Sequence, residues 1–127
     1  MVAVRKRSAK REQFLKDVLV TAVESNPYTP WFSFDDYHPD AGTVTVWHDK
    51  EEDGSYCDGP YAVDLDTIAA ALATYREQVA ALPSGGKNTY AYQLVLADRS
   101  NGDDGDFDVT TADAIMQIAV LGEEIYG

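Results

Sequence analysis

The segment from Thr110 to Leu121 constrains the fold of this chain more than any other. Its helical spacing leaves apolar side chains on nearly every side, among them Ile115, Met116, Ile118, Ala119 and Leu121. A helix that is apolar on all sides is stable only when other elements cover it. Because Thr110 and Asp113 have the spacing of a capping box, we expect a central helix that begins at Thr110.

Three other helices are predicted around this central segment. One extends from Ser8, its N-cap, to about Glu24 and carries a single apolar stripe. A second begins with Asp66 as its N-cap and ends at "LPSGGKN", where proline and glycine interrupt the helical pattern. A third covers roughly residues 89–98. The length of 127 residues suits one domain with a buried core, so residues 1–127 are expected to form a single domain.

Residues 31–49 have the pattern of a β-hairpin. "HPDAG" supplies the turn, with residue 38 opposite residue 43, and the alternation of "TVTVWH" places Val44 and Val46 on one face. "YAVDL" adds a third strand. The chain is therefore predicted to be α+β, with an N-terminal helix, a three-stranded antiparallel meander and then three helices packed on one face of the sheet.

The net charge of −12 is unevenly distributed along the sequence. Residues 1–16 carry six Lys or Arg against one Glu, a charge of +5, and residues 17–127 carry four against 21 acids, a charge of −17. Such a body repels nucleic acids and membrane surfaces and attracts basic protein patches. The short basic arm, about residues 1–8, is expected to fold back onto the acidic body or to belong to a solvated helix face, and nucleic-acid contact is the less favoured interpretation.

Nothing in the sequence resembles a secretory signal or a membrane span. The basic start "MVAVRKRSAKREQF" lacks an apolar segment after it, and the longest apolar run is "IAAALA". A single cysteine, Cys57, excludes an internal disulfide framework. These features predict a location in the cytoplasm.

Six aspartates lie between residues 97 and 117, at positions 98, 103, 104, 106, 108 and 113. Calcium-loop spacing fails in both registers: Gly105 at loop position six puts Ser100 first, and Gly102 there puts Ala97 first. Three interpretations stay open. The segment is an acidic turn that favours the start of the next helix, a contact surface, or an irregular cation site.

Other residue combinations indicate no catalytic chemistry. "PSGGKNT" lacks the first glycine and the final Ser or Thr of a phosphate-binding loop. His38 and His48 have no partner at metal-ligand spacing, and acids on both sides of Cys57 disfavour its thiolate. We therefore expect no catalytic residue, no metal site and no cofactor.

The hairpin region is rich in aromatic residues, namely Tyr28, Trp31, Phe32, Phe34, Tyr37 and Trp47. This set is larger than one face of two strands can bury. One interpretation is an exposed aromatic patch edged by Asp35, Asp36 and Asp40, which is typical of protein-binding surfaces. The other is that these side chains belong to the core.

Three stretches together resemble a group of small acidic proteins of unknown function from actinobacteria and their phages and plasmids. They are "RSAKREQFLKDVLVTAVE", "LDTIAAAL" and "LADRSNGDDGDFDVTTADAIMQIAVLGEEIYG", about half of the chain. The resemblance implies a bacterial or phage cytoplasm and a mobile-element setting. It implies no activity and no catalytic residues.

The leading functional hypothesis is a non-enzymatic binding module, an inhibitor that imitates a polyanion and binds a basic surface of a host protein. Its candidate partner-binding residues are Asp98, Asp103, Asp104, Asp106, Asp108, Trp31, Phe32, Asp35 and Asp36. A second candidate face comprises Asp49, Glu51, Glu52, Asp53 and Asp58. The alternatives are a cation-dependent protein or enzyme that uses the carboxylates of residues 98–108, and a housekeeping domain whose charge serves solubility.

Overall fold

The computed structural model describes residues 7–28, 30–49 and 57–126. Its helices and strands follow one another in the order α1 (Ala9–Glu24), η1 (Asn26–Tyr28), β1 (Phe32–His38), β2 (Thr43–Asp49), β3 (Cys57–Val63), α2 (Leu65–Ala80), η2 (Pro83–Gly86), α3 (Ala91–Ser100) and α4 (Val109–Leu121).

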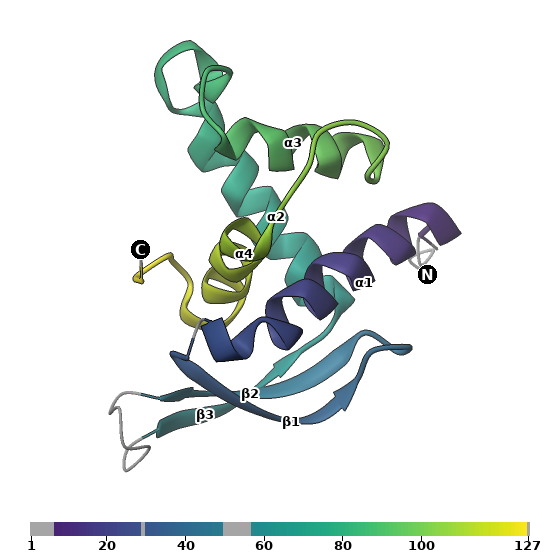
Figure 1. Cartoon of the computed structure of the whole chain (residues 1–127), viewed down its shortest axis with the longest axis vertical. Helices are drawn as coiled ribbons and strands as arrows, with labels where there is room; N and C mark the ends of the chain where they lie inside the picture. The colour runs from purple at the N-terminus through teal and green to yellow at the C-terminus, as the bar shows by residue number, and fades with distance from the viewer. Residues whose placement is uncertain (1–6, 29, 50–56, 127) are drawn as a thin grey trace, which may run out of the picture.

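The predicted α+β fold is confirmed. The three strands form one antiparallel sheet in the order β1-β2-β3, and all four α-helices lie on the same side of it (Figure 1). Val44 and Val46 are buried on the helix side, as their alternation predicts. None of the described helices lies on the other face of the sheet (Figure 1).

Helix α4 occupies the centre of the helical layer. It contacts α1, α2 and β3, and its residues from 111 to 118 are all buried. Helix α3 packs against α2 at the end of the molecule farthest from the sheet (Figure 1). The apolar character of the last helix thus predicts its central place correctly.

The hairpin pairing is as predicted at the turn and shifts by one residue farther along. His38 pairs with Thr43, but an irregularity between Asp35 and His38 places Phe32, rather than Ser33, opposite His48. Asp36 lies in this irregular segment with a φ of 47°. An extra residue in one strand has this effect on register, and here it puts Phe32 on the buried face, opposite His48.

The starts of two helices differ from the predictions for reasons of local hydrogen bonding. Helix α2 is capped by Asp64, not Asp66, because Asp64 accepts from the backbone N–H of Thr67 and the Thr67 hydroxyl accepts in return. The same reciprocal arrangement joins Asp108 and Thr111 at the start of α4. The predicted box of residues 110 and 113 is therefore wrong.

Helix α3 begins and ends about two residues later than predicted, and β3 begins at residue 57 instead of 61. Asn101, in the left-handed conformation, ends α3. Asparagine tolerates this conformation better than most residues do.

Candidate functional site

The face of the sheet opposite the helical layer is not covered by any of the described helices (Figure 1). Side chains that alternate with the buried ones point to this face: Ser33, Asp35, Thr43, Thr45, Trp47 and Asp49. Asp35 and Asp36 are exposed, whereas Trp47 is partly buried. The surface therefore combines hydroxyls, carboxylates and one indole ring.

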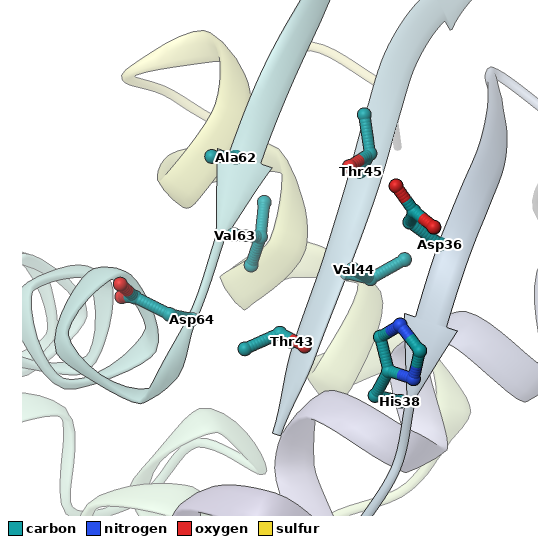
Figure 2. Close-up of a pocket in the computed structure, with 8 residues that line it drawn as sticks. All are labelled: Asp36, His38, Thr43, Val44, Thr45, Ala62, Val63 and Asp64. Atoms are coloured by element: carbon teal, nitrogen blue, oxygen red, sulfur yellow. The ribbon is translucent and has the colours of Figure 1, made fainter. Parts of the chain in front are cut away.

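A hollow of about 320 Å³ lies at the turn end of this face. Figure 2 shows Asp36, His38, Thr43 and Thr45 on its β1 and β2 side and Asp64 at the opposite rim. The carboxylate and hydroxyl oxygens among these side chains accept hydrogen bonds. Asp64 uses its carboxylate to cap α2, and the backbone N–H of Thr67 lowers its pKa.

The charge around the sheet is one-sided. Between Glu24 and Arg76 the sequence holds ten acids and a single cation, Lys50, which lies outside the described residues. Among the described residues, neither Asp35 nor Asp36 has a basic partner, and Asp35 accepts the backbone N–H of Asp36. The charges of Asp35 and Asp36 are thus left unneutralised by the part of the chain that the structure describes.

Two hairpin aromatics expected at the surface are instead buried. Trp31 is 7% exposed and Phe32 is 2% exposed, so the expectation that they form a contact surface is wrong. Phe32 pairs with His48 on the face that the helices cover, and the Trp31 indole reaches Asp113 on α4. Phe34, at 39%, is partly accessible at the edge of the sheet.

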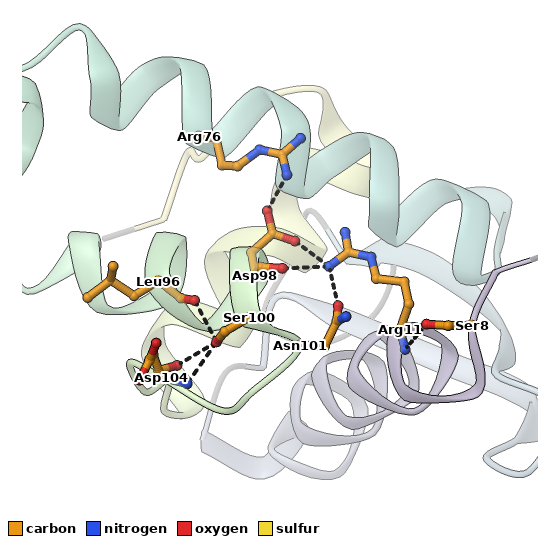
Figure 3. Close-up of polar contacts among 8 residues, drawn as sticks. All are labelled: Ser8, Arg11, Arg76, Leu96, Asp98, Ser100, Asn101 and Asp104. Carbon is orange, nitrogen blue, oxygen red and sulfur yellow. Dashed lines mark hydrogen bonds and ion pairs between the residues drawn. The ribbon is translucent and has the colours of Figure 1, made fainter.

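Asp98 does not belong to an acidic surface either. It is 2% exposed, and its carboxylate lies between two guanidinium groups, 2.6 Å from Arg11 Nη1 and 2.6 Å from Arg76 Nη1 (Figure 3). The Arg76 contact is a hydrogen bond, whereas the Arg11 contact with Oδ1 is an ion pair without hydrogen-bond geometry. Arg11 also donates to the backbone carbonyl of Asp98. The cluster therefore joins α1, α2 and α3.

The remaining loop carboxylates are partly engaged. Asp103 pairs with Lys10 of α1, Asp106 accepts the backbone N–H of Phe107, and Asp108 caps α4. The backbone N–H of Thr111 lowers the pKa of Asp108. Asp104 is exposed. The loop is therefore a structural connection in which Asp103, Asp104, Asp106 and Asp108 all stay exposed, and Lys10 offsets the charge of Asp103.

Basic residues of α1, and Arg7 of the predicted arm, form ion pairs with acids of the body. Arg7 pairs with Asp66, Lys10 with Asp103 and Arg11 with Asp98. Residues 1–6 lie outside the described residues.

A buried polar network under the C-terminal segment was missed by the sequence reasoning. Gln117 accepts the backbone N–H groups of Ile125 and Tyr126 and donates to Asp113. The Tyr126 hydroxyl lies 2.7 Å from His48 Nε2, and its ring stacks on Trp31. Asp113 and Gln117, four residues apart in an otherwise apolar helix, are the signal that could have revealed it.

The second candidate acidic face is only partly visible. Asp49 accepts a hydrogen bond from the hydroxyl of Ser33. Asp58 of β3 lies opposite His48 of β2 in the strand pairing. The predicted members Glu51, Glu52 and Asp53 lie outside the described residues. Cys57, next to this segment, is exposed.

Within the described ranges, no group of three or more His, Cys, Asp or Glu side chains is placed to hold a metal ion. No described helix has the length and apolar character needed to cross a membrane. Comparison with protein-family models, with curated proteins and with solved structures gives no match.

Proposed function

We propose that this chain is a non-enzymatic acidic module that binds a basic surface of another protein. The observation that supports it best is the one-sided charge of the sheet: its strands carry four acids, Asp35, Asp36, Asp49 and Asp58, and no Lys or Arg, and none of the described helices covers its outer face. Basic side chains from α1, α2 and the arm instead pair with acids of α2, of α3 and of the loop that follows α3.

The mechanism is electrostatic complementarity. Carboxylates on the chain occupy a basic groove that a partner otherwise offers to phosphates, which speeds association and blocks the groove. In the phage or plasmid setting that the sequence resemblance implies, the partner is a nucleic-acid-binding or defence protein of a bacterial host, and the two meet in its cytoplasm.

The engaged state of the loop carboxylates favours this proposal over a cation-dependent activity. Asp98 already faces two arginines, and Asp103 faces Lys10. A calorimetric titration with calcium, magnesium and manganese tests the alternative directly. Heat of binding together with a rise in melting temperature would favour it over the binding module.

Affinity capture at two salt concentrations tests the proposed function. The immobilised chain should retain host nucleic-acid-binding proteins at about 0.05 M salt and release them by about 0.5 M, because screening weakens contacts between exposed charges. The released proteins should then lose DNA binding when the chain is added back. Retention that ignores ionic strength, or retained proteins that still bind DNA, would contradict the proposal. A charge that serves only solubility predicts no competition with DNA.

A further inference from the structure

The uncovered face of the sheet has the chemistry of a site for cationic side chains. Its partly buried Trp47 lies against Gly59 of the neighbouring strand, where an added Cβ would stand 3.0 Å from the indole Cδ1. The glycine thus leaves room for a flat aromatic ring on the surface. Exposed aromatic faces attract Lys and Arg through the quadrupole of the ring, whose face is electron-rich.

The hollow at the turn end of the same face adds hydrogen-bond acceptors. Asp36, Thr43 and Thr45 line it together with His38, and Asp36 is the carboxylate there that caps no helix (Figure 2). A guanidinium group carries five donors and no acceptor, and its planar shape suits paired contacts with a carboxylate. At about 320 Å³ the hollow is at the small end of ligand pockets, which suits one long side chain.

The negative charge of this face decides which kind of partner can bind it. A second copy of the chain, placed face to face, would bring Asp35 and Asp36 against the same carboxylates, which is repulsive. Nucleic acids are repelled for the same reason. A basic protein segment is the partner that gains from these charges.

We propose that the outer face of the sheet binds an arginine-bearing segment of the partner, with a guanidinium in the hollow beside Asp36 and a neighbouring cation over Trp47. This inference rests on the proposed function and specifies which surface performs it. It moves the binding face away from the loop of residues 103–108 and onto the sheet.

Titration with a short Arg–Gly repeat peptide, compared with a Lys–Gly repeat of equal length, tests the proposal. Asp35→Asn with Asp36→Asn removes two charges from the sheet. Asparagine at the second position tolerates the left-handed backbone, and at the first position it keeps an acceptor for the backbone N–H of the next residue. Asp103→Asn with Asp104→Asn, both exposed, removes the same charge from the loop and is the matched control.

We expect the sheet variant to bind the arginine peptide about tenfold or more weakly, and the loop variant to bind within about threefold of the parent. The arginine peptide should bind more tightly than the lysine peptide and change the fluorescence of Trp47. Trp47→Phe should abolish that change, because the remaining Trp31 is buried. Amide signals of residues 43–47 should shift more than those of 103–104.

The outcomes separate this inference from the proposed function. Equal weakening in the two variants, or a larger loss in the loop variant, overturns the sheet site while binding to a basic peptide stands. Equal affinity for the two peptides overturns the guanidinium hollow. Absence of binding to either peptide at low salt overturns the proposed function and this inference with it.

Discussion

The indole N–H of Trp31 donates a hydrogen bond to Oδ1 of Asp113 across 2.7 Å inside the core. The second oxygen of that carboxylate accepts from Gln117 Nε2 at 2.8 Å. Trp31 directly precedes β1, whereas Asp113 belongs to α4, so the contact ties the sheet to the central helix. A carboxylate placed in an acidic stretch of sequence therefore acts as an internal acceptor for two donors.

Replacing Asp113 with alanine should destabilise the chain by roughly 2 kcal/mol or more, because two buried donors lose their acceptor. Urea unfolding followed by far-ultraviolet circular dichroism measures the loss. Asp104→Ala, which changes an exposed aspartate, is the control and should alter stability by no more than about 0.5 kcal/mol.

Trp31→Phe keeps a ring in the core and removes the donor. The cost of Trp31→Phe with Asp113→Ala together should fall below the sum of the two single costs, since the residues are in contact. Strict additivity would show that the hydrogen bond contributes nothing to stability.

Local patterns in the sequence predict much of this fold. The cap at Ser8, the pairing of residues 38 and 43, and the buried positions of Val44 and Val46 all follow from neighbours within a few residues. The central place of α4 follows because an apolar surface on all sides leaves no other arrangement. These features depend on periodicity and turn chemistry, which a single sequence displays.

The candidate site was less predictable because burial depends on residues far apart in the chain. Asp98 and Asp103 look alike in the sequence, yet Arg11 and Arg76 draw only Asp98 into the interior. Gly105 matters for a similar reason. An added Cβ at Gly105 would lie 2.2 Å from the carbonyl oxygen of Gln93, so the loop packs closely on α3. The residue spacing of a calcium-binding loop carries no information about this contact.

Removing the carboxylate of Asp98 and removing its two guanidinium partners should destabilise the chain by different amounts. Asp98→Asn should cost roughly 1–3 kcal/mol, because water still reaches the side chains of Arg11 and Arg76, which are 23% and 41% exposed. Arg11→Met with Arg76→Met should cost more, since it leaves a fully buried carboxylate without a cation. Urea unfolding at neutral pH compares them.

The matched control for this comparison is Lys10→Met, which removes a cation whose ion pair with Asp103 is exposed. It should change stability by less than about 1 kcal/mol. If Asp98→Asn and the double arginine variant lower the free energy of unfolding equally, burial of the unpaired carboxylate does not dominate the stability of this cluster.

The caps Asp64 and Asp108 should make the chain sensitive to acid. Hydrogen bonds from the backbone N–H groups of Thr67 and Thr111 lower the pKa of these carboxyls in the folded state. Their stabilisation is complete above the unfolded-state pKa, about 4, and is lost as the pH falls from there through the lower folded-state pKa. Stability should therefore decline on acidification in this range.

Asp64→Ala and Asp108→Ala should each cost roughly 1 kcal/mol at pH 7 and less at pH 3. Asp64→Asn and Asp108→Asn keep a capping acceptor that does not titrate, so they should be less affected by the same change of pH. Urea unfolding at several pH values measures both series. A cost of the alanine variants that is constant with pH would refute the role of the caps.

The C-terminal segment should detach when Gln117 loses its amide. Gln117 is buried and bonds the backbone of Ile125 and Tyr126, so Gln117→Leu leaves these backbone groups without their side-chain partner. We expect faster amide hydrogen exchange at residues 125 and 126, while the amides of α1 and α2 exchange as before. Tyr126→Phe keeps the stack on Trp31 and loses only the bond to His48, so it should cost roughly 1 kcal/mol or less. Unchanged exchange at residues 125 and 126 in the Gln117→Leu variant would show that the aromatic stack alone holds this segment.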